Sequence, residues 1–325
     1  GWYGMTQDDV LLHTGAFNWT YTLGTGLFDP WANGASSIVY TGPRDRGIWL
    51  KLIEDLKPTI MAAVPALYRQ MLSNGGLSPD KVSSLRHVLT AGEAIFPDLM
   101  KEWQDITGLP IYEALGMSEI STYISSSPTV PIRAGSPGKA QQGRSIAILP
   151  VAGGDEPLQA GETGLLAVHR SDPGMMLGYW NRPDEDEAVT RGDWFVGGDL
   201  GHFDDDGYFW YEGRNDDVMT SFGYRISPLE VETALMRHPA VAQAGVTEVE
   251  INPGMKLVSA FVVLHEYEKV TSADLIDFAS GTLARYKVPK QVFFVNELTR
   301  TPNGKIVRRA LATLLNVTKD HANDP

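Results

Sequence analysis

The chain has 325 residues, of which 43% are hydrophobic and 21% charged, and its formal net charge is -13. This composition is typical of a globular protein, and the length allows about two domains. The absence of cysteine excludes disulfide scaffolds, thiolate metal sites and cysteine nucleophiles, and the acidic surface disfavours nonspecific binding to nucleic acid. We expect a cytoplasmic protein, because no apolar stretch reaches roughly 18 residues and the first ten residues lack a signal-peptide pattern.

Helix and strand patterns alternate from residue 46 to about residue 127. Apolar residues with helical spacing are bounded by prolines and glycines, and a short apolar run follows each helix. Such alternation predicts a parallel sheet with covering helices, whose ligands bind at the carboxyl ends of the strands. The expected helices are 46–56, 65–76 and 96–108, and the expected strands with their following loops are 59–64, 85–94 and 109–119.

The next part of the chain, about 128–213, is rich in glycine, proline and short β-type runs. Strands are expected within 145–150, 164–169 and 207–213, and the Asp-Gly pair before the last of these predicts a hairpin turn. The fold class of the first 213 residues is therefore α/β, with a parallel-sheet part followed by a β-rich part.

The pattern of the final part of the chain predicts a hinge at 214–218, followed by a small, mobile α+β domain at 219–325. Ser227, Pro228 and Glu230 have the spacing of a capping box at the start of a helix. The further expected elements are strands at 256–266 and 290–298, a helix at 272–284 and a short basic helix at 306–311.

Motifs of several enzyme classes are missing from the sequence. We find no dinucleotide-binding glycine pattern, no Walker-type phosphate loop, no His-Glu-x-x-His and no Gly-x-Ser-x-Gly. The 7 histidines are scattered, so a histidine metal site is not expected. The acidic runs at 184–187 and 204–206 are interpreted as solvated turns, because charge runs usually lie in water.

Four stretches stand out together: "LTAGEA" at 89–94, "YEALGMSE" at 112–119, "WFVGGDLGHFDDDGYFWYEGRNDDVMTSFGYRISPLEVE" at 194–232 and "TPNGK" at 301–305. Their order and spacing resemble the adenylate-forming superfamily of acyl-CoA synthetases, adenylation domains and luciferases. The third stretch is most similar to acetyl- and medium-chain acyl-CoA synthetases, and "LTAGEA" is also similar to benzoate-CoA ligases. The resemblance covers nearly the whole chain.

This resemblance implies a two-step reaction with ATP, Mg2+ and coenzyme A. A small carboxylic acid attacks the α-phosphate of ATP to give an acyl-adenylate, and the thiol of coenzyme A then displaces AMP. Because the carboxylate and the phosphates repel each other, the site needs positive charge where the new bond forms. Lys305, which follows a Pro-Asn-Gly turn, matches the residue that supplies this charge.

The resemblance also assigns residues to the nucleotide and the cation. Asp199 matches a residue that accepts hydrogen bonds from ribose hydroxyls, and Arg214 one that binds ribose and phosphate. Ser118 and Glu119 match a pair that handles phosphate and Mg2+, a cation that prefers oxygen ligands. The remaining matches are the adenine loop at Gly92, Glu93 and Ala94 with Glu113 at its edge, the hinge at Asp216, a pantetheine-channel glycine at Gly223 and a phosphate-contacting arginine at Arg225.

Some positions depart from the family's pattern. Leu115 stands where an aromatic residue often stacks on adenine, so contact there becomes dispersion and burial. Thr220 stands where many relatives have lysine. No stretch matches the family's glycine- and Ser/Thr-rich phosphate loop, which in the family precedes the region that aligns with residue 1.

We therefore expect the chain to be the latter part of a longer enzyme. The isolated 325-residue chain should have little or no adenylation activity, because the loop that holds the β- and γ-phosphates is missing from it. A pyrophosphate-release assay checks this, and robust release by the isolated chain would contradict the expectation.

Three small or aromatic residues match the wall of the acyl pocket: Trp19, Ala91 and Gly116. In acetate-specific relatives a tryptophan at the position of Gly116 closes the pocket. Glycine there implies an acid larger than acetate, either medium-chain or aromatic.

The sequence leaves three functions open. The favoured one is an acid–thiol ligase that makes acyl-CoA. The others are an adenylation domain that delivers to a carrier protein, and a non-catalytic nucleotide-binding module. The "SFGYR" stretch favours the first, and the set of Lys305, Asp199 and Arg214 argues against the third. The oligomeric state is also open, with a homodimer as one alternative.

Overall fold

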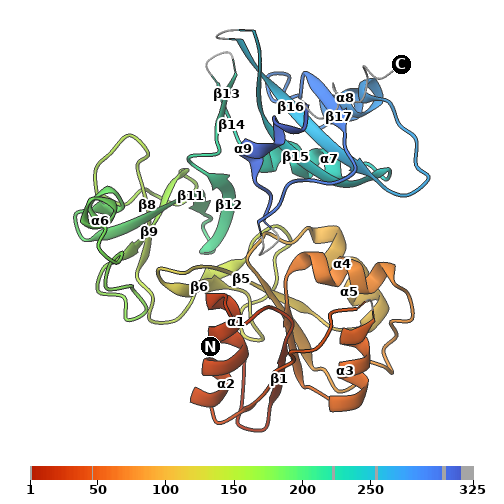
Figure 1. Ribbon diagram of the computed structural model, residues 1–325. Helices are drawn as coiled ribbons and strands as arrows, with labels where there is room; N and C mark the ends of the chain where they lie inside the picture. Colours follow the sequence, from red (N-terminus) through yellow and green to blue (C-terminus); the bar gives the residue numbers. More distant parts are fainter. Residues whose placement is uncertain (1, 46, 222–223, 253–254, 302–304, 316–325) are drawn as a thin grey trace. The chain divides into compact units, whose positions relative to one another are not determined.

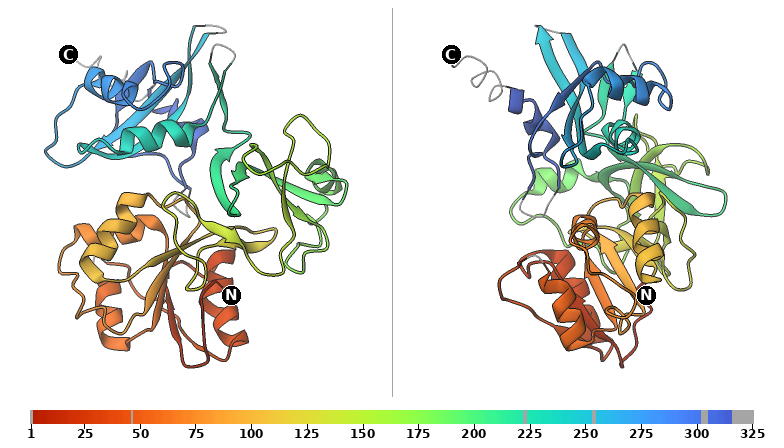
Figure 2. Two further views of the ribbon diagram at one scale, coloured as in Figure 1. Left: turned by 180° about the vertical axis from the view of Figure 1, so that it is seen from behind. Right: turned by 90° about the vertical axis from the view of Figure 1, so that its right-hand side faces the viewer.

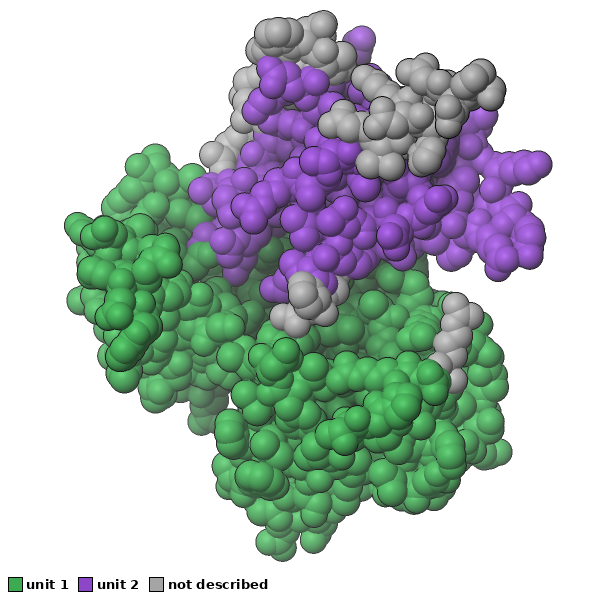
Figure 3. Space-filling view, viewed as in Figure 1, with its two compact units in different colours: residues 1–197, 201–211 green, residues 198–200, 212–325 purple. Residues whose placement is uncertain are grey.

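The computed structural model describes residues 2–45, 47–221, 224–252, 255–301 and 305–315, without the side chains of 220–221, 224–225, 251–252 and 255. The chain forms two compact units, which Figure 3 shows in different colours. Unit 1 comprises residues 1–197 and 201–211, and unit 2 comprises residues 198–200 and 212–325.

The first half of unit 1 is the expected parallel sheet with covering helices. Helices α3, α4 and α5 lie together beside the strands (Figure 1), and apolar residues of all three helices share one core with the sheet. The strands lie in the order β2 (Ser36–Ile38), β1 (Val10–His13), β3 (Ile60–Ala63), β4 (His87–Ala91) and β5 (Ile111–Met117), and the helices are α3 (Ile48–Leu56), α4 (Pro65–Ser73) and α5 (Pro97–Thr107).

Alternate residues of the parallel strands bury opposite faces of the sheet. Leu12, Met61 and Val88 pack against the core that includes α3 to α5. Their neighbours Leu11, Ile60 and Leu89 pack in a second core on the other face, where Tyr21 also packs. Burial on both faces explains why these strands are continuous apolar runs rather than alternating ones.

A short helical segment that the sequence did not predict follows β1. It consists of α1 (Thr20–Leu23), a π-helical turn (Gly24–Phe28) and α2 (Asp29–Ala32). A Cβ atom at Gly26 would lie 2.7 Å from the Cβ of His13, so glycine permits this close approach to β1. The glycines and the proline within the segment obscure its helical periodicity.

Strand β5 marks the change from parallel to antiparallel pairing. It pairs with β4 on one side and with β6 on the other, where the register shifts between Leu115 and Gly116. The strand ends at Met117, within the range 109–119 expected for the strand and its loop. The sheet continues through β6 (Ser121–Ser125), β7 (Gly138–Ala140), β12 (Tyr208–Arg214), β11 (Trp194–Phe203), β9 (Gly164–His169) and β8 (Ile146–Leu149), with β10 (Thr190–Arg191) paired to β11.

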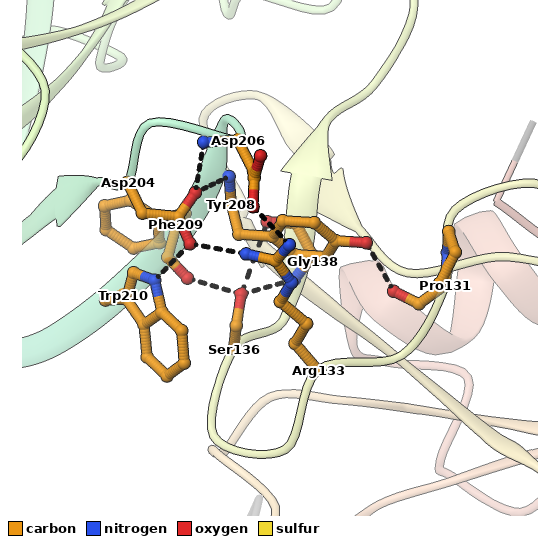
Figure 4. A network of polar contacts seen from close by, with 9 residues as sticks. All are labelled: Pro131, Arg133, Ser136, Gly138, Asp204, Asp206, Tyr208, Phe209 and Trp210. Carbon is orange, nitrogen blue, oxygen red and sulfur yellow. Dashed lines mark hydrogen bonds and ion pairs between the residues drawn. The ribbon is translucent and has the colours of Figure 1, made fainter.

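The expected hairpin is formed by β11 and β12, and its turn is fixed by Asp204 (Figure 4). The carboxylate of Asp204 accepts hydrogen bonds from the backbone N–H of Tyr208 at 2.9 Å and from the indole N–H of Trp210 at 2.9 Å. Arg133 pairs with Asp204 at 2.8 Å and lies 4.0 Å above the Tyr208 ring. Asp204 is therefore a structural part of the turn, and its interpretation as a solvated charge was wrong.

The run 204–206 does lie at a turn, as predicted, but the other acidic run, 184–187, does not. It lies in helix α6 (Pro183–Ala188), none of whose residues is buried. Pro183 at the first helical position and three acidic residues in the first turn favour a helix N-terminus, because that end carries partial positive charge.

Unit 2 is a three-stranded sheet with helices on both faces (Figure 2). Helices α7 and α8 share the main core with the sheet, whereas Leu311 of α9 packs in a second core with Val249 and Phe261. The strands are β15 (Val241–Asn252), β16 (Met255–Leu264) and β17 (Gln291–Phe294), the helices are α7 (Pro228–Met236), α8 (Ser272–Ser280) and α9 (Arg308–Leu311), and a separate hairpin is formed by β13 (Met219–Ser221) and β14 (Tyr224–Ile226).

The capping box predicted at the start of α7 is absent. Ser227 is the residue before the helix, but its hydroxyl donates to the carbonyl oxygen of Glu212 instead. The carboxylate of Glu230 accepts from the ammonium group of Lys287 at 2.7 Å. A capping box that the sequence analysis missed lies at α8, between Thr271 and Asp274.

Among the helices that the structure describes, none is long and apolar enough to cross a membrane.

A buried ion-pair network joins α7, α9 and the segment before β13. The Glu232 carboxylate, whose side chain is 4% exposed, accepts hydrogen bonds from two nitrogens of Arg308, at 2.8 and 2.7 Å. Arg308 also donates to Asp217 at 2.8 Å, and Glu232 also accepts from the backbone N–H of Val246 at 2.9 Å. Removing one partner of such a network leaves a buried charge without compensation.

We expect Glu232→Ala to lower the free energy of unfolding of unit 2 by about 3 kcal/mol. Hydrogen exchange of the α7 and β15 amides measures this change within the unit itself. The control is Glu230→Ala on the same helix, which removes a pair whose carboxylate side is 44% exposed and should cost less than about 1 kcal/mol. Equal losses of protection in the two variants would contradict the expectation.

Candidate functional site

The carboxyl end of β4 carries the first group of predicted site residues. Gly92 directly follows the strand with a backbone φ of +96°, and a Cβ atom there would lie 2.8 Å from the Trp19 ring. Both facts require glycine at this position. Ala91, the last residue of β4, is buried. The structure therefore brings three predicted residues, Trp19, Ala91 and Gly92, together at one strand end.

The loop after β4 is tied to β5 through Glu113. The backbone N–H of Ile95 donates to Oε1 of Glu113 at 3.2 Å, and the Glu113 backbone N–H donates to the Ser126 hydroxyl at 2.9 Å. In the loop itself, Glu93 and Ala94 lie between Gly92 and Ile95. Glu93 is half-buried and Ala94 is exposed. Glu113 itself is 6% exposed, and this burial raises its pKa to about 8, although the Ile95 hydrogen bond acts in the opposite direction.

Leu115 and Gly116 lie at the register shift of β5. Leu115 is half-buried and packs against the apolar core around Ile120 and Tyr123. A Cβ atom at Gly116 would lie 2.7 Å from the carbonyl oxygen of Ser121, which is a backbone atom and cannot move aside. Close backbone packing is thus a sufficient reason for glycine here, independent of any role in the acyl pocket.

Ser118 and Glu119 follow β5 directly. The exposed Ser118 hydroxyl lies 3.0 Å from the hydroxyl of Thr20 in α1. The Glu119 carboxylate accepts a hydrogen bond from the hydroxyl of Tyr179 at 2.9 Å. The structure thus places Ser118 and Glu119 just after the carboxyl end of β5, the strand that carries Glu113.

Unit 2 contains a second group of predicted residues. Arg214 at the end of β12 lies 3.7 Å from the buried carboxylate of Asp199 in β11, and it donates to Asp216 at 3.0 Å. A Cβ atom at Gly198 would lie 3.1 Å from the Arg214 guanidinium. Burial tends to raise the pKa of Asp216, but the hydrogen bond and charge of Arg214 outweigh this and lower it.

The remaining predicted residues are described only in part. Lys305 is exposed, its N–H donates to the Thr301 hydroxyl at 3.1 Å, and its carbonyl accepts from the Thr301 N–H at 2.8 Å. Arg225 lies in β14 opposite Thr220, and its side chain is outside the described part of the structure, as is that of Thr220. Gly223 lies wholly outside the described residues.

The sequence analysis missed a buried polar group beside Trp19. The Trp19 and Tyr21 rings lie 5.3 Å apart, and the Tyr21 and His13 rings 4.6 Å apart. Nδ1 of His13 accepts from the Gly15 N–H at 3.0 Å, so the neutral ring carries its proton on Nε2. Burial, and then the charge of Arg44, lower the His13 pKa to about 3.

Several polar atoms of this group lack a hydrogen-bond partner among the described residues: Nε2 of His13 and the hydroxyls of Tyr21 and Thr22. A histidine at the end of a strand, followed by an aromatic stretch, was the only signal in the sequence. Buried polar groups are normally satisfied, so these atoms indicate a place for water or a polar ligand group.

The described residues fit Mg2+ better than a metal held by protein alone. In the ranges that the structure covers, no three His, Asp or Glu side chains gather as a metal site. Mg2+ is usually bound by one or two carboxylates together with phosphate oxygens and water. Glu119 is the carboxylate that could serve in this way.

Glu113 should make the stability of unit 1 depend on pH. Between the ordinary carboxyl pKa of 4.5 and about 8, the folded state holds a proton that the unfolded state releases. The free energy of unfolding therefore falls as pH rises through this window. Glu113→Gln keeps an acceptor for Ile95 and removes the titration. At pH 8.5 its free energy of unfolding should therefore exceed that of the wild type by about 2 kcal/mol, and it should unfold at a higher temperature.

Thermal unfolding of both proteins at pH 6 and pH 8.5 measures this difference. Glu102→Gln, on the exposed face of α5, is the control and should follow the wild type at both values. The account of Glu113 fails if Glu113→Gln and the wild type lose stability equally with rising pH.

Comparison with known proteins places this geometry in a family. Residues 1–180 match the family described as AMP-binding enzyme, and residues 230–305 match the AMP-binding enzyme C-terminal domain. Among curated proteins, the chain is 36% identical over 321 residues to the mitochondrial acyl-coenzyme A synthetase ACSM5 of Mus musculus, covering 95% of this chain and 54% of that protein. The chain thus spans about half the length of the curated relatives that it matches.

Solved structures show the same likeness. The anthranilate CoA ligase AuaEII in complex with anthranoyl-AMP has a TM-score of 0.85 and 30% identity, covering 98% of this chain and 62% of that one. The O-succinylbenzoate coenzyme A synthetase MenE of Bacillus subtilis, in complex with ATP and a magnesium ion, has a TM-score of 0.82 and 29% identity, covering 95% and 62%. The chain therefore belongs to the family of AMP-binding enzymes.

Proposed function

We propose that this chain is part of an AMP-forming acyl-CoA synthetase, which activates a carboxylic acid larger than acetate with ATP and transfers it to coenzyme A. The observation that carries the proposal is the arrangement at β5. Glu113 lies in β5 beside the carboxyl end of β4, which Gly92 follows, and Ser118 and Glu119 come directly after β5. Ligands of such sheets bind at this edge.

Nucleotide-binding roles are proposed for backbone and carboxylate groups within each unit separately. The loop Gly92, Glu93 and Ala94 would bind the adenine, together with Glu113 and Leu115. At pH 7 the buried carboxyl group of Glu113 is protonated, because its pKa is about 8, so it can donate a hydrogen bond to a ring nitrogen. In unit 2, Asp199 would accept from the ribose hydroxyls, with Arg214, Arg225 and Gly223 assigned to the phosphates and the pantetheine arm.

The chemistry requires charge neutralisation around the α-phosphate. Glu119 would hold Mg2+ on the phosphate oxygens, and the Ser118 hydroxyl would contact phosphate. Lys305 would provide the positive charge between the carboxylate and the α-phosphate. Asp216 is proposed as the hinge about which residues 219–325 change position between the two half-reactions.

The acid is proposed to be medium-chain or aromatic. The names of the similar proteins refer to acyl-CoA, anthranilate and O-succinylbenzoate ligases, which favours coenzyme A over a carrier protein as the acceptor. Trp19 and Ala91, which lie together at the end of β4, would line the acyl pocket. Gly116 gives weaker support for a pocket larger than acetate needs, because backbone packing already requires glycine there. Cytoplasmic location stays a proposal, because the curated relative is mitochondrial.

The proposal is tested with the full-length protein and a panel of acetate, octanoate, benzoate and 2-aminobenzoate. We expect pyrophosphate release with an acid larger than acetate, and an acyl-CoA product when coenzyme A is added. Lys305→Ala should lower pyrophosphate release by about 100-fold or more, since it removes the charge that the reacting anions need.

The control is Lys290→Ala, an exposed lysine of unit 2 outside the proposed site, which should leave the rate unchanged. Activity with acetate alone would contradict the proposed acid class. No pyrophosphate with any acid would favour a non-catalytic nucleotide-binding protein.

A further inference from the structure

A segment far along the chain contacts the metal-site candidate Glu119. The hydroxyl of Tyr179 donates to Oε1 of Glu119 at 2.9 Å, and the backbone N–H of Met176 donates to the Glu119 carbonyl at 2.7 Å. We call residues 172–186 the strap. It thus holds both the side chain and the backbone of Glu119, all within unit 1.

The start of the strap is anchored to the strand that follows Glu119. Arg144 forms an ion pair with the buried carboxylate of Asp172 and donates to the carbonyl of Thr122 at 3.0 Å. At Gly174 a Cβ atom would lie 2.7 Å from the carbonyl of Ile120, so the strap packs against the backbone there. These contacts fix the distance between the strap and β6.

The end of the strap is anchored by the acidic helix α6. Oδ1 of Asp186 accepts from the backbone N–H of Tyr179 at 2.9 Å. Gly178, which precedes Tyr179, has a φ of +146°, and a Cβ atom there would lie 2.9 Å from Oδ2 of Asp186. Asp186 therefore sets where the tyrosine backbone lies, and through it where the hydroxyl points.

We propose that Tyr179 is a positioning residue that holds the Glu119 carboxylate in the orientation needed to bind a divalent cation, and that Asp186 fixes Tyr179 for this task. The inference rests on the proposed function only in its choice of cation. Oε1 of Glu119 is bonded to Tyr179, whereas Oε2 has no hydrogen-bond or ion-pair partner among the described residues. One oxygen is thus fixed by the protein and the other is free for the cation.

The chemistry of the contact supports this division. A hydrogen bond to a carboxylate is stronger than one between neutral groups, and it limits the rotamers of the glutamate before the cation arrives. A phenolic hydroxyl carries a proton at neutral pH, so Tyr179 donates to the carboxylate there.

The test measures Mn2+ binding by electron paramagnetic resonance, using full-length protein with a non-hydrolysable ATP analogue. Tyr179→Phe should raise the Kd for Mn2+ about tenfold. In the pyrophosphate assay it should raise the Mg2+ concentration for half-maximal rate by a similar factor, with little change in kcat at saturating Mg2+.

Tyr208→Phe is the matched control. It removes a tyrosine hydroxyl that donates over the same 2.9 Å, but to the carbonyl of Pro131, away from Glu119. It should leave Mn2+ binding unchanged.

Variants of Asp186 test the anchor at the end of the strap. Asp186→Ala should raise the Kd for Mn2+ severalfold, whereas Asp186→Asn keeps the Oδ1 acceptor and should bind Mn2+ as the wild type does.

The outcomes separate this inference from the proposed function. If Tyr179→Phe or Asp186→Ala weakens Mn2+ binding while the wild type forms no acyl-adenylate, the positioning role stands and the proposed reaction fails. A Kd within twofold of the wild type in both variants would overturn the inference, even with full acyl-CoA synthesis. Absence of Mn2+ binding to the wild type with nucleotide would overturn it as well.

Discussion

The structure depends on one constraint at β5, which must pair in parallel on one side and antiparallel on the other. The change of pairing is accompanied by a register shift between Leu115 and Gly116, where the backbone of β6 comes too close for any side chain. Irregular pairing of this kind alters the direction of the side chains that follow it. Glu113 precedes the shift and is buried, whereas Ser118 and Glu119 follow it at a more accessible position. In the proposed function, this one strand therefore contributes to both the adenine-binding region and the phosphate region.

The charges of the candidate site matter because the chain has a net charge of -13, whereas the proposed substrates, ATP and an acid, are both anions. Burial keeps Glu113 protonated up to a pH of about 8, which removes one negative charge from the proposed adenine side. Arg214 lies beside Asp199 and Asp216 and partly compensates both carboxylates. Burial thus neutralises Glu113, Arg214 pairs with Asp199 and Asp216, and the Tyr179 hydroxyl orients Glu119.

The parallel sheet and its helices could be predicted because their apolar periodicity matches their burial. Helices such as Pro97–Thr107 begin at a proline and end at a glycine, and Gly108 has the left-handed conformation that ends a helix. The failures arose where tertiary contacts compete with local preference. Ser227 has the spacing of a capping residue, yet its hydroxyl is used by Glu212. Asp204 belongs to a charge run, yet Trp210 and Arg133 make it structural.

The site residues, too, could be predicted where a local motif identifies them and not where only tertiary contacts do. Motifs placed Gly92, Glu113, Ser118 and Glu119 near one another, and the strand order shows why they lie at one edge. Tyr179 and Asp186 could not be predicted, because they are separated from Glu119 by about sixty residues of β-rich chain whose path depends on the contacts of Arg144 and Asp172. The buried polar group around His13 escaped notice for a related reason: a lone histidine in a sequence is most often structural.

The central claim is that this chain contributes to a site that joins a carboxylic acid to AMP. The most direct measurement is mass spectrometry of acid-quenched full-length protein after incubation with ATP, Mg2+ and an aromatic or medium-chain acid, without coenzyme A. The account predicts an acyl-adenylate that remains bound and disappears when coenzyme A is added. Bound ATP without any acyl-adenylate, for every acid that the protein binds, would contradict it.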